Sequence, residues 1–273
     1  MKVLLRQFYR SLMRRFMSEC DDSDLGRSAI VFSPHPDDET LGCGGTIIRK
    51  KRAGADVKIV FMTDGSRSHK RLISENELKS IRTSEAVAAA QMLGVEPHDV
   101  FFLEFKDGEL DKNQDAATNK VTEIILRYQP NQIFLPYHKE APPDHSITNQ
   151  LVVSALKMCR LNATIYEYPI WFWYHWPWVS IPIGFHRETL SLLKHSLATG
   201  FGLSLLCDYS SSVYIGDVLN LKRAALNQHR SQMEKLIPDT NWQTLDSIAN
   251  GEWLECFFQE YEFFRHYSFL EED

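Results

Sequence analysis

The chain has 273 residues, of which 44% are hydrophobic and 24% are charged, and this composition is typical of a globular protein that buries a core. Its formal net charge of −6 argues against general nucleic-acid binding, because that function needs a basic surface to neutralise phosphates. The 5 cysteines are scattered and form no CxxC pair, which argues against a disulfide framework and a thiolate zinc site and favours a reducing cytoplasm.

Residues 1–28 form an N-terminal basic segment. Basic side chains alternate there with apolar ones, which predicts an amphipathic helix, and no uninterrupted apolar run or small-residue cleavage site indicates a signal peptide. No apolar run in the chain reaches the roughly 18 residues of a transmembrane helix. In the favoured interpretation, this helix packs on the domain or is frayed. The alternative brings it to an anionic surface at the inner face of a membrane.

From residue 29 onward, short apolar runs alternate with helical patterns. The runs are rich in Val, Ile and Phe, as expected for strands buried on both faces of a sheet. Alternating strands and helices predict an α/β, Rossmann-like fold, in which a mostly parallel sheet carries helices on both faces and functional groups gather at the carboxyl ends of the strands. The predicted strands are 29–33, 57–63, 100–105, 132–137 and 164–171, and the predicted helices are 41–54, 75–94, 116–128 and 146–160.

The alternation ends near residue 171. Residues 171–186 contain four tryptophans, together with prolines that interrupt regular structure. A helix is predicted over 213–236, and the last twenty residues are rich in aromatic side chains. With no internal repeat or linker, residues 29–273 are predicted to form a single domain with an aromatic-rich C-terminal part. Trp171 and Trp173 are candidates for binding a sugar ring, with core or dimer packing as the alternative.

One imidazole and three carboxylates crowd the turn after the first predicted strand: His35, Asp37, Asp38 and Glu39. An imidazole nitrogen with carboxylate oxygens is a partial ligand set for zinc, which needs a third protein ligand in a catalytic site. Adjacent aspartates on a turn point in different directions, so one can bind the metal while the other acts as a base. The alternative, negative charge that only caps the following helix, explains one carboxylate but not the whole group.

A second group of polar residues follows the fourth predicted strand. His145 lies at the start of the next predicted helix, and Asp144 precedes it. A carboxylate hydrogen-bonded to a ligating imidazole is a common supporting arrangement, so Asp144 is expected to play that part. His138, in the same loop, is the alternative third ligand.

These motifs resemble the LmbE-like, or PIG-L, family of zinc-dependent de-N-acetylases, and the resemblance covers most of residues 29–232. Its strongest element is the His-Pro-Asp-Asp-Glu run that begins at His35, placed after the first strand. Further matches are Thr63-Asp64-Gly65, Arg82-x-x-Glu85 with Leu93-Gly94, Asp144-His145, and Lys222-x-x-Ala225-x-x-x-His229-x-Ser231-Gln232.

The resemblance implies that Zn²⁺ is bound by His35, Asp38 and His145. It also implies that Asp37 is the general base, taking a proton from the attacking water. The metal would activate that water and polarise the amide carbonyl.

Two further roles concern side chains around the motif. Arg82 matches a position that contacts substrate, and it shares a helix face with Glu85, three residues on. The alternative is that these two residues form only an ion pair. Glu39 is expected to hold the motif loop through backbone hydrogen bonds.

One position departs from the family pattern. The family's second motif is commonly His-Pro-Asp-His, and its first histidine is thought to assist the tetrahedral intermediate. That position is Pro142 here, which has no polar side chain. His138, four residues upstream, is therefore predicted to supply the missing group, with Tyr137 as an alternative.

The sequence thus predicts a zinc-dependent hydrolase that removes an N-acyl group, with acetyl favoured, from an N-acetylglucosamine-type sugar, glycoconjugate or glycan precursor. The expected partners are this substrate and no nucleic acid, in the cytoplasm, and a homo-oligomer is left open. The alternative function is a non-catalytic carbohydrate-binding or scaffolding protein that keeps the deacetylase fold.

Overall fold

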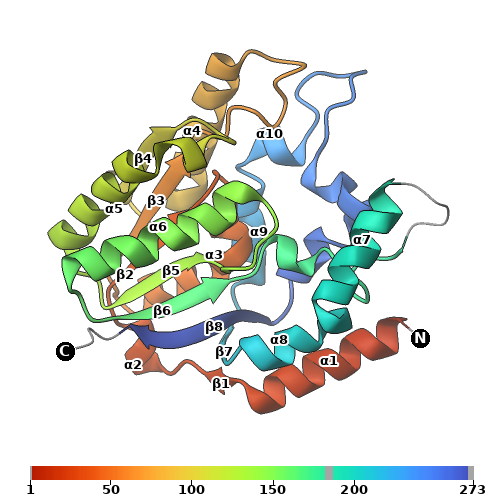
Figure 1. Cartoon of the computed structure of the whole chain (residues 1–273), viewed down its shortest axis with the longest axis horizontal. Helices are drawn as coiled ribbons and strands as arrows, with labels where there is room; N and C mark the ends of the chain where they lie inside the picture. The colour runs from red at the N-terminus through yellow and green to blue at the C-terminus, as the bar shows by residue number, and fades with distance from the viewer. Residues whose placement is uncertain (1, 182–186, 270–273) are drawn as a thin grey trace.

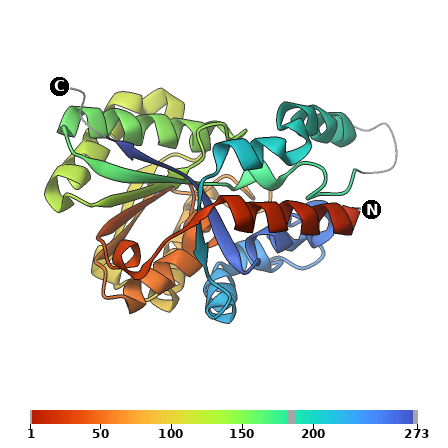
Figure 2. The same cartoon turned by 90° about the horizontal axis from the view of Figure 1, so that it is seen from below.

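The computed structural model describes residues 2–181 and 187–269, and its centre is a mixed sheet (Figures 1 and 2). Eight strands of the described chain form this sheet, in the order β1-β7-β8-β6-β5-β2-β3-β4. Their bounds are β1 Ser18–Glu19, β2 Ala29–Ser33, β3 Val57–Thr63, β4 Val100–Phe105, β5 Gln132–Pro136, β6 Ala163–Tyr168, β7 Ser211–Tyr214 and β8 Tyr261–Phe269.

The five strands β4, β3, β2, β5 and β6 are parallel neighbours, as the sequence predicts. The chain builds outward from β2 to β3 and β4, and then returns to the other side of β2 to add β5 and β6. Neighbouring strands β2 and β5 are therefore followed by chain segments that leave in opposite directions. This switch point is the place where an open parallel sheet forms a crevice at its carboxyl edge.

Successive residues of a strand face opposite sides of the sheet, which separates two cores. Ile30 and Phe32 of β2 pack with α5 and α6, whereas Val31 packs in the larger core with α3, α4 and α9 (Figure 1). The helices of the described chain are α1 Lys2–Phe16, α2 Asp22–Leu25, α3 Asp38–Arg52, α4 Glu75–Met92, α5 Gln114–Tyr128, α6 Pro143–Cys159, α7 Arg187–Ala198, α8 Leu203–Asp208, α9 Leu219–Leu226 and α10 Arg230–Met233.

The predicted parallel strands agree with the observed ones to within a few residues, because each is a short apolar run bounded by polar residues. The helix predicted over 213–236 is wrong in part. Its beginning belongs to strand β7, and the remainder is divided between α9 and α10. The aromatic-rich C-terminus forms β8, which is antiparallel to both β6 and β7. The aromatic side chains of Tyr261–Phe269 suit a strand. The segment becomes a strand because it pairs with β6 and β7, which are distant in sequence.

The N-terminal helix α1 packs on the domain, which confirms the favoured interpretation of this segment. Its Tyr9 and Met13 are buried, and the Arg6 guanidinium donates to the backbone oxygen of Pro177 at 2.7 Å. Directly after the helix, β1 pairs with β7 and so joins the sheet. Figure 2 shows α1 running alongside the teal helices α7 and α8.

Among the described residues, no single helix is both long and apolar enough to cross a bilayer. One bent pair, Thr189–Ala198 with Gly200–Asp208, has the length and composition of a membrane span when its two parts are taken together.

A buried ion pair joins the C-terminal strand to the helix that follows the His-Pro-Asp-Asp-Glu motif. The Lys222 ammonium lies 2.7 Å from a Glu262 carboxylate oxygen, and both side chains are almost completely buried. Lys222 also donates to the backbone oxygen of Leu41, while Glu262 accepts from the backbone N–H groups of Gly45 and Thr46. Every polar atom of the pair is thereby used, and α3 is fixed to both α9 and β8.

Because breaking a buried pair leaves an uncompensated charge, Lys222→Met is expected to lower the free energy of unfolding by about 3–5 kcal/mol. Urea unfolding followed by circular dichroism measures this change. The matched control is Arg49→Met, which breaks a more exposed pair with Asp217 at 3.0 Å and should cost less than about 1 kcal/mol. Adding Glu262→Gln to Lys222→Met should recover part of the loss. Equal effects of the two single variants would contradict this account.

Candidate metal centre and active site

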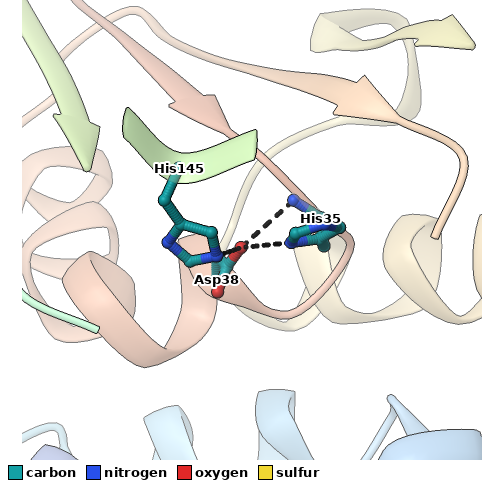
Figure 3. Close-up of side chains that lie close together, drawn as sticks. All are labelled: His35, Asp38 and His145. Atoms are coloured by element: carbon teal, nitrogen blue, oxygen red, sulfur yellow. Dashed lines mark hydrogen bonds and ion pairs between the residues drawn. The ribbon is translucent and has the colours of Figure 1, made fainter. Parts of the chain in front are cut away.

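The His-Pro-Asp-Asp-Glu motif and the second polar group meet at the switch point of the sheet. His35 follows β2, and Asp38 is the first residue of α3. His145 lies in the first turn of α6, after β5. Since β2 and β5 are adjacent parallel strands, residues more than a hundred positions apart come together at their carboxyl ends (Figure 3).

Three nitrogen and oxygen atoms point toward one another at this place. Oδ2 of Asp38 lies 3.2 Å from Nδ1 of His35 and 3.3 Å from Nε2 of His145 (Figure 3). The potential ligand atoms of these three residues all lie within 4.8 Å of one another, which is the spacing that a shared metal ion needs. Two imidazole nitrogens and one carboxylate oxygen are a donor set that zinc accepts, and three protein ligands leave a position for water.

The other nitrogen of His35 is held by two more carboxylates. Its Nε2 lies 3.3 Å from Oδ2 of Asp144 and 3.4 Å from Oδ1 of Asp107. Asp144 also accepts the backbone N–H of Gly108 at 2.7 Å, so its carboxylate is fixed. The sequence led us to expect Asp144 to support His145; the structure instead places it on His35, and Nδ1 of His145 is buried without a hydrogen-bond partner in the described chain. Asp144 precedes His145 in sequence, yet Asp144 contacts Nε2 of His35 while His145 contacts Asp38.

Burial and these neighbours set the charge of each group. Burial lowers the pKa of His145 to about 4, so its imidazole is neutral and has a lone pair to offer. Burial alone would raise the pKa of Asp38, but His145 and His35 hold it below its ordinary value. Burial likewise opposes protonation of His35, yet Asp107, Asp144 and Asp38 hold its pKa well above the usual range. A divalent cation beside Nδ1 would replace the proton that faces Asp38, while the proton on Nε2 stays between Asp107 and Asp144, so the residues present fit a metal ion.

Asp37 stands beside this cluster in a strained conformation. Its φ of 133° lies in a region that residues with a side chain rarely adopt, at a cost of about 1–3 kcal/mol. The Glu39 carboxylate accepts the N–H of Asp37 at 2.9 Å, which is the backbone contact expected of Glu39. Burial raises the pKa of Asp37 to about 7, against the opposing effect of the Arg82 guanidinium. A carboxyl group in this state can both accept and return a proton near neutral pH.

Arg82 secures the motif loop from helix α4. Its guanidinium contacts Oδ2 of Asp37 at 3.1 Å, the backbone oxygen of Pro36, and that of Gly65 at 3.0 Å. Gly65 has φ of +61°, and a Cβ there would lie 2.8 Å from this guanidinium, so only glycine fits. Arg82 does not pair with Glu85, which accepts from the backbone and hydroxyl of Ser231 instead.

The late family-like segment supports the motif from behind. His229 is completely buried, with Nε2 3.0 Å from the Glu39 carboxylate, and the neighbouring Glu85–Ser231 contacts join α4 to α10. Gln232 reaches the site itself and lines its cavity. The sequence resemblance of residues 222–232 is thus explained by contacts with the motif.

These residues surround a cavity of about 360 Å³. Trp171, which follows β6, and Trp253 stack with ring centroids 5.0 Å apart and form part of its wall. The buried Glu140 carboxylate accepts the backbone N–H of Trp171 at 2.7 Å and those of Ile170 and Phe172, which fixes this turn. The cavity lining comprises His35, Asp37, Asp38, Leu41, Arg67, Ser68, Arg82, Asp107, Gly108, Pro142, Pro143, Asp144, His145, Trp171, Gln232, Leu245 and Trp253.

Two of the predicted site residues lie elsewhere. Nδ1 of His138 is 2.7 Å from the Glu167 carboxylate, and His138 is absent from the cavity wall, so the structure does not bring it to the metal cluster. Trp173 is only 3% exposed and packs edge-on against Trp178 in the core. This position agrees with the alternative prediction for Trp173, which was packing in the core or in a dimer instead of binding a sugar. Pro142 does line the cavity, at the start of α6.

Several residues of the cavity wall were not among those predicted from the sequence. Asp107 follows β4, so the rule that functional groups gather at strand ends would have found it. Arg67 lies in the loop after β3 and had the same signal. Leu245 and Trp253 come from the irregular C-terminal part, and no sequence pattern placed them near His35.

Residues 30–156 match the PIG-L family, described as GlcNAc-PI de-N-acetylase. Diacetylchitobiose deacetylase of Thermococcus kodakarensis is 29% identical over 226 residues, covering 80% of this chain and 73% of that protein. The probable N-acetyl-α-D-glucosaminyl L-malate deacetylase 2 of Bacillus cereus is 27% identical, covering 85% and 96%.

A solved structure shares the fold over nearly the whole chain. The N,N'-diacetylchitobiose deacetylase of Pyrococcus horikoshii superposes with a TM-score of 0.62 at 24% identity, covering 96% of this chain and 92% of that one. These comparisons confirm the family resemblance, the α/β fold and the enzyme class predicted from the motifs, since members of the matched family are metal-dependent N-deacetylases.

Asp144→Asn is expected to weaken the binding of a divalent metal by about 10–100-fold, because an amide holds the His35 imidazole less firmly than a carboxylate does. Competition between the purified protein and a chelator measures the dissociation constant. Asp111→Asn, which changes an exposed aspartate outside the cavity, is the matched control. An unchanged dissociation constant in Asp144→Asn would mean that Asp144 does not support the metal site.

Proposed function

We propose that this chain, whose residues 30–156 match the PIG-L family of metal-dependent N-deacetylases, uses zinc to remove the acetyl group from an N-acetylglucosamine-type sugar. The named relatives act on diacetylchitobiose and, in the probable malate deacetylase, on an N-acetylglucosaminyl malate. Both substrates hold an acetamido sugar. The proposal for this chain is therefore hydrolysis of a linear amide on an amino sugar.

One observation carries the proposal. Two imidazoles and the Asp38 carboxylate converge on one point, and a separate buried carboxylate, Asp37, lines the same cavity. A purely structural cluster would need only the two imidazoles and Asp38. Asp37 has a pKa near neutrality and a strained backbone, and both features favour a role in proton transfer.

His35, Asp38 and His145 would hold the zinc ion. When bound, zinc supplies Lewis-acid polarisation of the amide carbonyl and activation of water. The residues of the chain keep this arrangement in place, because Asp107 and Asp144 fix the ring of His35 through its other nitrogen.

Asp37 would transfer the proton. Its carboxylate takes a proton from the attacking water as the C–O bond forms, and returns it to the amide nitrogen as the C–N bond breaks, so acetate and a free amine leave. Arg82 keeps the carboxylate oriented through the 3.1 Å contact. Arg82 also lines the cavity, which supports the substrate contact that the family resemblance implies for it.

The aromatic wall suits a sugar. Trp171 is partly exposed and stacks on the buried Trp253, so its ring offers an apolar surface to the less polar face of a pyranose ring. Gln232 and Ser68 add polar groups to the same cavity for the ring hydroxyls. The predicted help from His138 is not part of the proposal, because its ring is occupied with Glu167.

The direct test is release of a free amine from acetamido sugars by the zinc-loaded protein. Diacetylchitobiose, N-acetylglucosaminyl malate and free N-acetylglucosamine form the first panel, with acetate measured in parallel. Stoichiometric amine and acetate from at least one sugar would support the proposal. Binding of these sugars without any hydrolysis would favour the non-catalytic alternative.

The wild-type protein is expected to bind about one zinc ion per chain, and His145→Ala should lose most of it, because two ligands hold zinc far less tightly than three. Elemental analysis of dialysed protein measures the content. His138→Ala serves as the control, since this histidine lies outside the cluster and should leave the content unchanged. Normal zinc in His145→Ala would remove His145 from the ligand set.

Asp37→Asn should retain zinc and lose roughly 10²–10⁴-fold in kcat, because an amide cannot accept the proton. The substitution is nearly isosteric, and the amide can still accept the hydrogen bond from Arg82. Steady-state kinetics on the best sugar of the panel gives the comparison, with metal content measured on the same sample. A decrease below about tenfold would exclude Asp37 as the general base.

A further inference from the structure

A second cavity adjoins the first. Its volume is about 400 Å³, and it shares Arg67 and Ser68 with the cavity that contains the metal cluster. The loop after β3 supplies most of its wall, and the segment between α10 and the C-terminal part supplies the rest; these two loops project side by side at the top of Figure 1. We call it the outer cavity, lined by Arg67, Ser68, His69, Lys70, Arg71, Leu72, Asn241 and Gln243.

Specific contacts hold its two walls together. The buried His69 stacks on Trp242, with ring centroids 4.0 Å apart and an interplanar angle of 11°. Its Nε2 donates to the backbone oxygen of Gln243 at 2.7 Å, and Ser68 contacts Nδ1 at 2.9 Å. Burial lowers the pKa of His69, so this clamp is uncharged. The outer cavity is therefore a fixed feature of the fold.

The charges of the two cavities are opposite. Four carboxylates and two guanidinium groups line the first cavity, whereas three cationic side chains and no carboxylate line the outer one. Arg67 is paired with Glu109 at 3.0 Å. Lys70 and Arg71 are exposed and take part in no ion pair within residues 2–181 and 187–269. On a chain with a net charge of −6, this local excess of positive charge attracts an anion.

From this arrangement we propose that the substrate is an amino sugar carrying an anionic group, a phosphate or a carboxylate, on the part remote from its acetamide, and that the outer cavity binds this group. The inference rests on the proposed function and narrows its substrate class. With the acetamide at the metal cluster, the remote end of the molecule passes Arg67 and Ser68 and reaches Lys70 and Arg71. Guanidinium and ammonium groups donate charge-assisted hydrogen bonds to such anions.

Binding to the metal-free protein tests the outer cavity without any need for catalysis. Isothermal titration calorimetry compares N-acetylglucosamine 1-phosphate, an N-acetylglucosamine glycoside of a hydroxy dicarboxylic acid, and the neutral methyl glycoside. Either anionic sugar, or both, should bind at least about tenfold more tightly than the neutral one, and the tighter of the two identifies the anion. The preference should weaken as salt is raised.

Lys70→Ala/Arg71→Ala should abolish this preference and leave the neutral glycoside unaffected. The matched control is Lys157→Ala/Arg127→Ala, which removes the same charges from exposed positions on α6 and α5 outside both cavities. Equal affinities for anionic and neutral sugars in the wild type, or an unchanged preference in Lys70→Ala/Arg71→Ala, would overturn the inference.

Kinetics with the zinc-loaded enzyme separates this inference from the proposed function. The double variant should raise KM for the anionic sugar at least about tenfold with little change in kcat, because Lys70 and Arg71 lie outside the reacting cavity. A binding preference without hydrolysis of any sugar would overturn the deacetylase function and keep the anion site. Hydrolysis without any preference for anionic sugars would support the deacetylase function and overturn the anion site.

Discussion

The site depends on one imidazole held between carboxylates. His35 faces Asp38 with one nitrogen, and Asp107 and Asp144 with the other. His35 and Asp107 follow strands β2 and β4, and Asp38 and Asp144 lie at the starts of helices α3 and α6, so this ring joins four separate parts of the fold. Such a concentration of negative charge is costly without a cation, and a proton on His35 or a divalent metal in the cluster supplies it.

A set of buried polar contacts holds that arrangement. Glu39 lies between the Asp37 backbone and His229, and Glu140 fixes the turn that carries Trp171. Both carboxylates are buried; Glu39 joins the nearby Asp37 N–H to the distant His229, and Glu140 accepts only from backbone N–H groups about thirty residues away. The carboxyl edge of the parallel sheet therefore carries the motif. The later part of the chain packs against the motif through His229 and forms one wall of the cavity. This division explains why a motif-like segment recurs near residue 229.

The two adjoining cavities give the molecule an electrostatic direction. Acidic groups gather at the metal cluster, where the proposed function binds a cation and moves a proton, and basic groups gather beyond Arg67. A ligand with a neutral amide at one end and an anion at the other matches this gradient in only one orientation. In the proposed function, orientation of this kind would bring the scissile bond to Asp37 without requiring tight contacts along the whole sugar.

The sequence by itself determined the parallel strands and the chemistry of the first turn. Short apolar runs and strand-to-helix turns are local properties, so the five parallel strands and the grouping of His35, Asp37 and Asp38 could be predicted from them. The rule that functional groups gather at the carboxyl ends of parallel strands, together with the family resemblance, also allowed the prediction that His145 lies near this group. These features depend on neighbours in sequence or on a rule that holds for every parallel sheet.

The tertiary structure alone decided where each polar side chain points and which distant segments meet. Asp144 turns to His35 and not to the adjacent His145, His138 turns to Glu167, and Trp171 lines the cavity while Trp173 enters the core. Strands β7 and β8 exist because each finds a partner far away in the chain. A rotation about one side-chain bond, or the pairing of two remote strands, is decided by the packing of the whole molecule, and neither leaves a periodic pattern in the sequence.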